Sequence, residues 1–376
     1  MRIGFGVTAL CNGLSGGGLD GIGNYTREIM SRIRTSTDVE LTPFSFRAAI
    51  PPELGQGLVL GRYSVNTAWS VGTGANFFGI GRLTSKVDLI HATDHYVPKC
   101  KPVPMVSSLM DAIPLSHPQW LRSEFRTIKN ELWVRAANWA DEVITISEYS
   151  KTQIAKWTGI STTKITVIPL GVDERWFREV SSDDFARVRE KYQLPDNFYI
   201  SVGTLQPRKN VESTILAHRA LSQSERRRWP LIIIGRAGWK CERVLQLIEQ
   251  DASSGSVRWL KHVPDSDLLA VLKLASALVF PSLGEGFGLP VLEAFAAKVP
   301  VITSNTTSLP EVTGDAAIAI NPLDADAISK AMLQVMNDQE LVLQLKLKGL
   351  ARAKEFTWEN CAQETMGIYQ RMLSLR

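Results

Sequence analysis

The chain has 376 residues, of which 44% are hydrophobic and 21% are charged, and its formal net charge is +4. This length and ordinary composition predict a globular protein of two domains. The mild positive charge suits anionic small molecules or an anionic membrane surface, and it is too small to indicate nucleic-acid binding by itself.

The cysteines and the apolar runs together indicate a cytoplasmic protein. The four cysteines, Cys11, Cys100, Cys241 and Cys361, lack CxxC spacing, which argues against a disulfide framework and a cysteine metal site. The N-terminus "MRIGFGVTAL" lacks the apolar core of a signal peptide, and no run reaches the roughly 20 apolar residues of a membrane span. We therefore expect the protein in the cytoplasm or on the cytoplasmic face of the inner membrane.

Short apolar runs alternate with segments of helical period along the chain, a pattern typical of parallel sheets with helices on both faces. In the first half the expected strands read "RIGFGV", "VDLIHAT", "PMVSSL" and "EVITIS". In the second half they read "NFYISVG", "PLIIIGRAG", "VRWLKHV", "ALVFPS" and "PVITSN". The expected helices include residues 23–34, 120–139, 210–221, 265–275 and 325–336.

The strand pattern restarts near residue 195, after "ITVIPLGVDERWF" and a helical segment at 181–192. We therefore expect two α/β domains with doubly wound, Rossmann-like parallel sheets, residues 1–177 and 178–356, facing each other across a cleft. Residues 357–376 are expected to form a helix that packs back on the first domain. Such sheets bind ligands outside the carboxyl ends of their strands, which makes the cleft the expected site.

Residues 284–293, "GEGFGLPVLE", follow an expected strand that ends at Ser282. A glycine loop leading into a helix with Pro290 in its first turn presents backbone N–H groups and a positive dipole end, which suit an anion. Glu285 is expected in the loop and Glu293 in the first helical turn. Each glutamate alone is explained as a solvated or helix-stabilising charge. Together, beside an anion site, they favour a ligand with hydroxyl groups, such as a sugar or a ribose.

A second segment, "SVGTLQPRKN", places Arg208 and Lys209 just after the first strand of the second domain. Adjacent cations at the carboxyl end of a strand can neutralise a diphosphate. A solvated basic turn is the alternative interpretation of this segment taken alone.

These two segments resemble the retaining glycosyltransferases of family 4, which have the two-domain GT-B fold. The E-x7-E signature of that family is present as Glu285 to Glu293, and "GTLQPRKN" matches its basic element. The resemblance covers nearly the whole chain in order. Its other matches are "GIGNYTREI", "VITISEYSK", "VIPLGVD", "LIIIGRAGW", "HVPDSDLLAVL" and "PVITSNTTSLPEV".

The resemblance implies a nucleotide-sugar donor site in the C-terminal domain, with the acceptor bound by the N-terminal domain. Arg208 and Lys209 would hold the donor diphosphate, Glu293 would bind the nucleotide ribose, and Glu285 would bind the transferred sugar. The other implied donor contacts are Gly286, Phe287 and Gly288 at the sugar, the amides near Leu289, Pro290 and Val291 at the phosphates, His262 and Val263 at the base, and a loop around Gly21 and Gly23.

The resemblance also implies transfer with retention and without a cofactor or metal. The leaving diphosphate would take the acceptor proton on the same face of the sugar while Arg208 and Lys209 stabilise the developing charge. The catalytic residues implied are Asp111, Glu285, Arg208 and Lys209. The triplets "DSD" at 265–267 and "DAD" at 324–326 precede expected helices, so we interpret them as helix caps rather than metal ligands.

One position departs from the family pattern. Many members carry His-Asp in the segment that here reads "SSLMDAIPLSHP", where Met110 precedes Asp111. Because methionine binds hydroxyl groups poorly, either Asp111 supplies the polar contact or the donor has a different hydroxyl pattern. His91, His95 and His117 are weaker candidates for the same role.

The segments "GIGNYTRE" and "DAIPLSHP" are most like bacterial mannosyltransferases that assemble surface polysaccharides, such as lipopolysaccharide O-antigen or exopolysaccharide. This resemblance implies GDP-mannose as the donor and a lipid-linked or growing glycan as the acceptor. A dTDP-rhamnose, GDP-perosamine or UDP-sugar donor stays open.

The segment 120–139 supports contact with a membrane surface. Basic residues recur on one of its faces at helical spacing, namely Arg122, Arg126 and Lys129. Its tryptophans, Trp120, Trp133 and Trp139, could reach lipid headgroups. A solvated charged face over a core-packed tryptophan stripe is the alternative.

The sequence leaves three alternative functions to compare with this one. "GFGVTA" at 4–9 fits G-x-G-x-x-A, but its glycines fall inside the first strand rather than after it, which argues against a dinucleotide oxidoreductase. A nucleotide-sugar epimerase would share the fold. A non-catalytic partner of another transferase is suggested by Met110 and opposed by the intact pairs Arg208–Lys209 and Glu285–Glu293.

Overall fold

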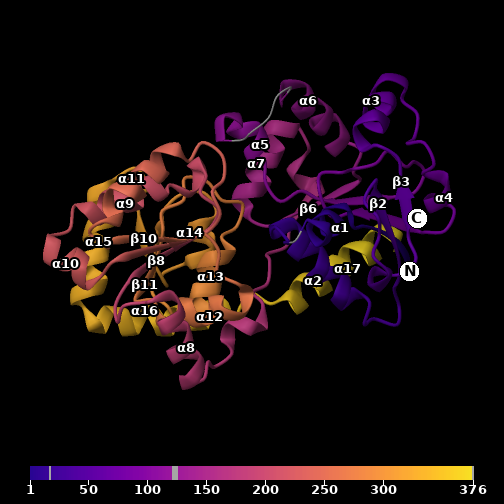
Figure 1. The fold of residues 1–376 in the computed structure, drawn as a ribbon. Coiled ribbons are helices and arrows are strands. Elements are labelled where there is room, and N and C mark those ends of the chain that lie inside the picture. The colour runs from indigo at the N-terminus through magenta and orange to yellow at the C-terminus, as the bar shows by residue number, and fades with distance from the viewer. Residues whose placement is uncertain (17, 121–125, 375–376) are drawn as a thin grey trace. The chain divides into compact units, whose positions relative to one another are not determined.

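The computed structural model describes residues 1–16, 18–120 and 126–374, which divide into two compact units (Figure 1). Within the described residues, the N-terminal unit comprises 1–118, 126–171 and 358–374. The C-terminal unit comprises 119–120 and 172–357. Each unit is built around its own parallel sheet.

The N-terminal sheet has seven parallel strands in the order β3-β2-β1-β4-β5-β6-β7. Its strands are β1 (Arg2–Gly6), β2 (Glu40–Phe46), β3 (Leu58–Leu60), β4 (Leu89–Ala92), β5 (Met105–Ser108), β6 (Glu142–Thr145) and β7 (Ile165–Val167). In the centre of the sheet Ile3 lies opposite Leu41 on one side and Leu89 on the other. The order reverses at β1, so the carboxyl ends of β1 and β4 form the topological switch point of this unit.

The helices of this unit are α1 (Thr8–Ser15), α2 (Gly21–Ile33), α3 (Tyr63–Thr73), α4 (Gly81–Thr84), α5 (Ile113–Ser116), α6 (Arg126–Ala137), α7 (Glu148–Thr158) and α17 (Trp358–Ser374). The C-terminal helix α17, yellow in Figure 1, lies beside α2. Arg32 on α2 forms an ion pair of 2.6 Å with Glu359 on α17. The last helix thus belongs to the same compact unit as the first strand.

The C-terminal sheet has six parallel strands in the order β10-β9-β8-β11-β12-β13. Its strands are β8 (Tyr199–Val202), β9 (Leu231–Ile234), β10 (Val257–Leu260), β11 (Ala277–Phe280), β12 (Val301–Ser304) and β13 (Ile318–Ile320). The sequences "LIII" of β9 and "ALVF" of β11 are fully buried, as expected for parallel strands covered on both faces. The order reverses at β8, which makes the carboxyl ends of β8 and β11 neighbours.

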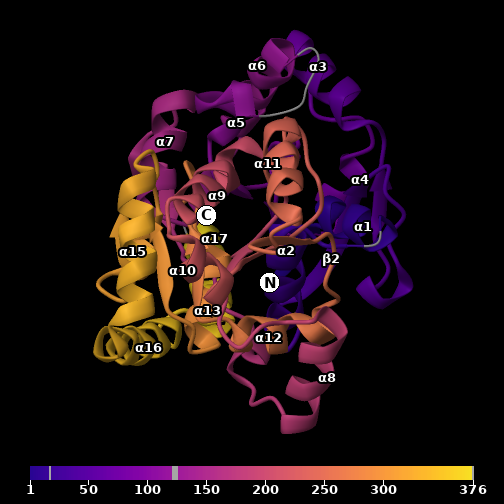
Figure 2. The same cartoon turned by 60° about the vertical axis from the view of Figure 1, so that its left-hand side comes forward.

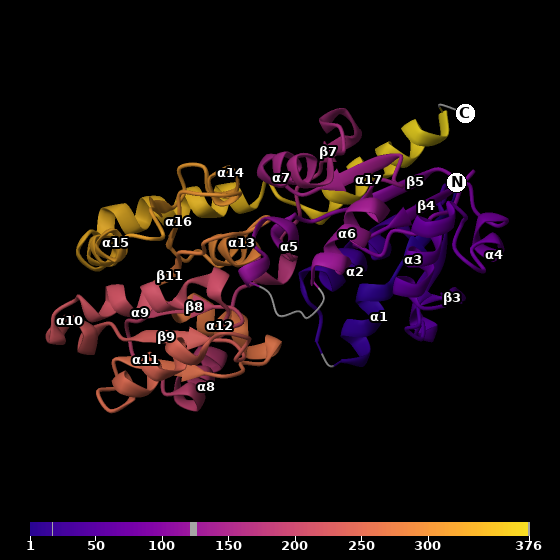
Figure 3. The same ribbon diagram turned by 90° about the horizontal axis from the view of Figure 1, so that it is seen from above.

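The helices of the C-terminal unit are α8 (Ser182–Tyr192), α9 (Val211–Arg219), α10 (Gln223–Arg228), α11 (Glu242–Ala252), α12 (Asp265–Leu274), α13 (Leu289–Ala296), α14 (Leu309–Thr313), α15 (Ala325–Asn337) and α16 (Gln339–Ala353). Figure 2 shows α16 running across the end of α15. Figure 3 shows α16 alongside α13. Gly349 of α16 allows this close packing, because an added Cβ there would lie 2.6 Å from the ring of Phe295 on α13.

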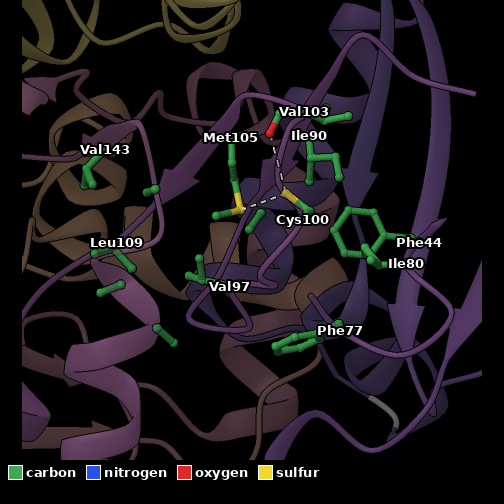
Figure 4. Packing of buried hydrophobic residues seen from close by; sticks show 14 of the residues in the cluster. Phe44, Phe77, Ile80, Ile90, Val97, Cys100, Val103, Met105, Leu109 and Val143 are labelled. Carbon is green, nitrogen blue, oxygen red and sulfur yellow. Dashed lines mark hydrogen bonds between the residues drawn. The ribbon is translucent and has the colours of Figure 1, made fainter. Parts of the chain in front are cut away.

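The core of the N-terminal unit is a cluster of buried aliphatic and aromatic side chains (Figure 4). Phe44, Phe77 and Ile90 pack in it together with the thiol of Cys100, which lies 3.9 Å from the sulfur of Met105. Burial raises the pKa of the Cys100 thiol to about 12. Cys100 therefore serves as a small apolar core residue.

A buried chain of hydrogen bonds ties the C-terminal helix to the centre of the same unit. Tyr369 Oη lies 2.5 Å from His91 Nδ1, and His91 Nε2 lies 2.8 Å from Ser108 Oγ. Ser108 Oγ in turn lies 2.7 Å from Tyr25 Oη. Burial lowers the pKa of His91 to about 3, so its ring is neutral and one nitrogen donates while the other accepts. The chain joins α17, β4, β5 and α2.

The predicted fold class, two Rossmann-like parallel-sheet domains, is confirmed, and every strand predicted from the sequence is present. Four strands were missed: β2, β3, β7 and β13. β2 contains Pro43, which weakens a strand signal, and the others have three residues each, too few to show a period.

Two predicted segments of the N-terminal unit differ in detail. The expected loop around Gly21 and Gly23 is the first turn of α2, because the side chain of Asp20 accepts a hydrogen bond of 2.8 Å from the N–H of Gly23 and caps the helix. The expected helix 120–139 begins at Arg126 where the structure describes it, after a short 3-10 turn at Pro118–Trp120. Residues 121–125 of that prediction lie outside the described residues.

Two glycine-to-alanine substitutions should have opposite effects on stability. Gly235, after β9, has a φ of +147°, and a Cβ there would lie 2.0 Å from the carbonyl oxygen of Gly203. We expect Gly235→Ala to lower the free energy of unfolding by about 3 kcal/mol or more. The matched control, Gly367→Ala on the exposed face of α17, meets nothing within 4 Å and should raise it by about 0.5–1 kcal/mol. Equal effects in denaturant titrations would contradict this.

Candidate functional site

Two loops meet at the switch point of the C-terminal sheet. Arg208 and Lys209 lie in a 3-10 turn, Pro207–Lys209, that follows β8. The neighbouring loop follows β11, and its Leu283 N–H donates a hydrogen bond of 2.7 Å to the carbonyl of Arg208. Ser282 Oγ lies 2.8 Å from the same carbonyl oxygen. The adjacency of β8 and β11 therefore places the two basic residues beside the glycine loop of residues 284–288.

The carboxylate of Glu285 lies between these two cations. Arg208 Nη1 is 2.6 Å from Oε2, and Lys209 Nζ is 2.7 Å from Oε1. Ser282 Oγ donates to Oε1 at 2.6 Å. Burial alone would raise the pKa of Glu285, but the charges of Lys209 and Arg208 outweigh it and hold this pKa at about 2. Burial lowers the pKa of Lys209, which the charge of Glu285 counteracts. We call these three charged residues the Glu285 cluster.

The Glu285 cluster has hydrogen-bonding capacity left for a ligand. A carboxylate oxygen accepts about two hydrogen bonds. Oε1 of Glu285 accepts from Lys209 and Ser282, whereas Oε2 accepts from Arg208. A guanidinium has five N–H donors and an ammonium three. The cluster, with a formal charge of +1, could thus bind an anion and accept one hydroxyl group.

Asn210 holds the basic turn in place. Its backbone is left-handed, with a φ of 54°, a conformation that asparagine tolerates. Its Nδ2 donates to the carbonyls of Pro281 at 3.0 Å and Pro322 at 2.7 Å. Asn210 closes the predicted segment "PRKN", but sequence reasoning gave it no role, because its two acceptors come from distant parts of the chain.

The glycine loop enters α13 through a backbone that requires glycine. Gly288 precedes the helix with a φ of +125°, and a Cβ there would lie 2.7 Å from the side chain of Leu309. Ser308 Oγ lies 2.9 Å from the carbonyl oxygen of Phe287, which makes it a second residue that sequence reasoning missed. Pro290 has no N–H, and the N–H of Val291 donates to the Gly288 carbonyl at 2.9 Å. Of the amides expected to contact phosphate, that of Pro290 therefore has no N–H group, and that of Val291 already donates within the chain.

Glu293 is the fifth residue of α13, so the prediction that it lies in the first turn is wrong. The helix begins only at Leu289, because Gly288 keeps a non-helical backbone. Burial raises the pKa of Glu293 to about 7. The charge of Arg175 opposes this shift, whereas Asp265 and Asp173 add to it.

Arg175 was not predicted from the sequence. It precedes the predicted boundary of the second domain, and its Nη1 forms an ion pair of 2.9 Å with Asp265. This part of the site, with three carboxylates and one guanidinium, is acidic, whereas the Glu285 cluster is positive.

Arg208 and Lys209 each contact Glu285 directly. The other residues predicted to bind the donor lie at separate places in the structure. Phe287 is buried, with its ring 5.7 Å from that of Phe356, and Gly286 is buried beside it. His262 is exposed and Val263 buried just after β10, the edge strand of the same sheet. Gly21 and Gly23 belong to the N-terminal unit.

Met110 and Asp111 line a pocket of about 520 Å³ in the N-terminal unit. Asp111 follows β5 and accepts a hydrogen bond of 2.9 Å from the N–H of Ile113. Of the three histidines weighed for the missing role, only His95 lines this pocket among the described residues. His91 is fully buried in the hydrogen-bonded chain with Tyr369, and Nδ1 of His117 lies 2.8 Å from Ser116 Oγ.

One of the two acidic triplets is a helix cap as predicted. Asp324 precedes α15 and its side chain accepts from the N–H of Ala327. The prediction is wrong for residues 265–267, because Pro264 takes the N-cap position of α12 and no side chain of the described residues caps this helix. Asp265 pairs with Arg175, and Asp267 is buried among cations. Arg187 and Lys191 contact Asp267 at 2.9 and 2.7 Å.

Two of the three tryptophans of segment 120–139 favour the core-packing alternative, whereas Trp120 belongs to the C-terminal unit. Trp133 and Trp139 pack against the N-terminal core. Lys129 is exposed, whereas Arg122 and the side chain of Arg126 lie outside the described residues. In the part of the chain that the structure describes, no helix has the length and apolar character needed to span a bilayer.

Comparison with known families matches both units. Residues 20–176 match the model described as "Glycosyltransferase Family 4", and residues 183–351 match the model "Glycosyl transferases group 1". The first match covers most of the N-terminal sheet, and the second includes the Glu285 cluster.

Among curated proteins, the chain is 38% identical over 229 residues to O-antigen chain mannosyltransferase B of Escherichia coli, covering 61% of this chain and 60% of that protein. It is 33% identical over 237 residues to the serotype-specific mannosyltransferase WbdA of Escherichia coli, covering 62% of this chain and 29% of that protein. The matched regions thus span about three fifths of the first relative and less than a third of the second.

Among solved structures, the fold is similar to that of sucrose-phosphate synthase from Thermosynechococcus elongatus, with a TM-score of 0.75 and 18% identity over the full length of both chains. Anabaena HepE in complex with UDP and glucose has a TM-score of 0.73 and 18% identity, covering 98% of this chain and 99% of that one. At such identities the likeness shows the fold.

Ionisation of the two signature glutamates should have opposite effects on the stability of the fold. The folded-state pKa of Glu293, about 7, is above its ordinary value of 4.5, so a destabilising penalty builds between pH 4.5 and 7 and is complete above 7. Glu293→Gln should therefore raise the free energy of unfolding of the C-terminal unit by about 3 kcal/mol at pH 8 and have little effect at pH 4.

The folded-state pKa of Glu285, about 2, is below its ordinary value, so its stabilising contribution is complete above pH 4.5 and is lost as the pH falls toward 2. Glu285→Gln should therefore be destabilising at pH 8, and its effect should shrink in acid. Denaturant titrations of both variants at each pH measure this contrast, and parallel pH profiles for the two would contradict it.

Proposed function

We propose that this chain, which belongs to the family 4 glycosyltransferases with the GT-B fold, transfers a hexose from a nucleotide sugar to a glycan acceptor. The observation that carries the proposal is the Glu285 cluster at the switch point of the C-terminal sheet. It presents two cations to an anion, and it retains one acceptor oxygen for a hydroxyl group. A nucleotide sugar has both chemical features.

The donor would use the two parts of this site differently. Its diphosphate would bind the cationic groups of Arg208 and Lys209, and a hydroxyl of the transferred sugar would donate to Oε2 of Glu285. The ribose hydroxyls would bind Glu293, whose pKa near 7 lets it either donate or accept a hydrogen bond. The acidic surroundings of Glu293 suit hydroxyl groups, and the positive cluster suits phosphate.

Transfer would proceed with retention of the anomeric configuration. The acceptor oxygen forms its bond to the anomeric carbon on the face from which the diphosphate departs, and the bond to the diphosphate oxygen breaks. The acceptor proton passes to a diphosphate oxygen, so no base on the opposite face is needed. Arg208 and Lys209 stabilise the charge that develops on the leaving group, a task that requires fixed, preoriented donors.

The two protein cations are also the reason to propose a reaction without a divalent metal. A metal ion bound to a diphosphate neutralises leaving-group charge, and Arg208 with Lys209 would do the same. Transfer by chelator-treated protein should then equal that of the untreated protein. A loss that Mg²⁺ or Mn²⁺ restores would contradict metal independence and leave the transferase proposal standing.

We propose mannose as the sugar and GDP-mannose as the donor, within the assembly of a bacterial surface polysaccharide such as O-antigen. The support is the 38% identity to a protein named as an O-antigen chain mannosyltransferase. A lipid-linked or growing glycan would be the acceptor, bound in the cytoplasm or at the cytoplasmic face of the inner membrane.

A panel of GDP-mannose, GDP-perosamine, dTDP-rhamnose and UDP-sugars tests the donor. Turnover of GDP-mannose with retention is the expected result, and turnover of another donor alone would overturn the choice of sugar. Solvent deuterium entering a UDP-sugar without an acceptor would instead indicate an epimerase.

Loss of one phosphate contact should be visible in the kinetics of transfer. We expect Lys209→Ala to lower kcat/KM by about 10²- to 10³-fold, corresponding to about 2–4 kcal/mol of transition-state binding. Lys330→Ala, an exposed lysine on α15, is the control and should leave kcat/KM unchanged. A Lys209→Ala protein that folds and transfers at the normal rate would refute the assignment of the donor site.

A further inference from the structure

Two hollows of the N-terminal unit share one wall. The larger, of about 520 Å³, is the pocket that contains Met110 and Asp111. The smaller, of about 410 Å³, lies toward the end of β2 and is lined by Arg47 and Arg62. Tyr63, Ser64 and Tyr96 line both hollows, so the two lie side by side on this unit.

The larger hollow has the chemistry of a site for an uncharged saccharide. Asp94 and Asp111 line it, and Asp94 is only 3% exposed. The carboxylate of Asp94 is held by the N–H groups of Ala9 at 3.2 Å and Tyr96 at 2.8 Å. Each of these donors fills one lone-pair position and leaves others for sugar hydroxyls. The rings of Tyr96 and Trp133 offer apolar faces to a sugar ring.

Anions are disfavoured in the larger hollow. Asp94 is buried, so little water reaches its carboxyl group. Lys129 is the only lysine or arginine among the described residues that line the hollow, whereas two aspartates, Asp94 and Asp111, line it. A phosphate placed there would lie beside two carboxyl groups and one lysine.

The smaller hollow has the opposite charge. Arg47 and Arg62 are its charged residues, and no aspartate or glutamate lines it in the part of the chain described. Neither guanidinium forms an ion pair or a side-chain hydrogen bond with another described residue. The sequence contains no acidic residue between Glu53 and Asp88. Such a pair of guanidinium groups suits a phosphate or a carboxylate.

The backbone at Arg47 and Arg62 also favours the binding of an anion in the smaller hollow. Arg47 has a φ of +61°, an uncommon conformation for arginine, and its N–H donates to the carbonyl of Leu60 at 3.0 Å. Arg62 immediately precedes α3, whose first turn has no acidic residue. The positive end of the helix dipole therefore adds to the charge of Arg62.

We propose that the acceptor of this enzyme is an anionic glycan, with its sugar end in the larger hollow and a phosphate or carboxylate group bound by Arg47 and Arg62. This inference rests on the proposed glycosyltransferase function and names the chemical class of its acceptor. The anionic group could belong to the diphosphate of a lipid carrier or to the glycan itself.

Binding of matched disaccharides, measured by calorimetry with GDP present to occupy the donor site, tests the inference. The probes are a mannose disaccharide, the same disaccharide with a phosphate at its reducing end, and its lipid-diphosphate form in detergent. We expect the phosphorylated probe to bind about tenfold or more tightly than the neutral one, as for a charge-assisted hydrogen bond. Tighter binding of the lipid form than of the soluble phosphate would identify the carrier as the source.

Substitutions distinguish the contributions of the two hollows to binding. The double variant Arg47→Ala/Arg62→Ala should abolish the preference for phosphate and leave binding of the neutral disaccharide unchanged. Asp94→Asn should weaken both soluble probes equally. Arg82→Ala, an exposed arginine of α4 outside both hollows, is the control and should change neither.

Equal binding of the two soluble probes to the unmodified protein, or a phosphate preference that survives the double substitution, would overturn the inference. The proposed function is judged separately, because turnover in the donor panel does not depend on the phosphate of the acceptor. Turnover without a phosphate preference would overturn this inference alone.

Discussion

The ionised carboxylate of Glu285, held between Arg208 and Lys209, is the interaction on which the candidate donor site depends. A carboxyl group buried alone would take up a proton, and a lysine buried alone would lose one. Each keeps the other charged, and Ser282 adds a hydrogen bond. Because β8 and β11 are neighbours in the sheet, the loops that carry these residues meet at its carboxyl edge. The topology of the sheet thus makes the charge cluster possible.

The two glutamates of the signature have different surroundings, and we expect different roles for them. Glu285 is surrounded by cations and stays ionised far below neutral pH, whereas Glu293 lies near Asp173 and Asp265 and titrates near pH 7. A nucleotide sugar contains a strongly anionic diphosphate flanked by two sets of hydroxyl groups. A site that is positive at one glutamate and acidic at the other is complementary to that arrangement.

The pocket of the N-terminal unit contains a carboxyl group that the sequence did not predict there. The sequence drew attention to Met110, where the family usually has histidine, and to Asp111. The structure adds Asp94, a buried carboxylate after β4 that lines the same pocket. Together with the hollow of Arg47 and Arg62, it gives this unit the two kinds of chemistry that an anionic glycan requires. These residues come from four separate segments of the sequence, which is why no short motif contains them.

The sequence by itself determined the fold class, the central strands of both sheets, and the presence of a basic turn and of a glycine loop after two of those strands, because these depend on local periodicity and on motifs of adjacent residues. It missed the three-residue strands, which exist only because longer neighbours supply their hydrogen bonds. Only the tertiary structure decided that Arg208 and Lys209 contact Glu285, that Arg175 lies near Glu293, and that Asp94 shares a pocket with Asp111. Charges and pKa values depend on distance and burial, and these are set by strand order rather than by position along the chain.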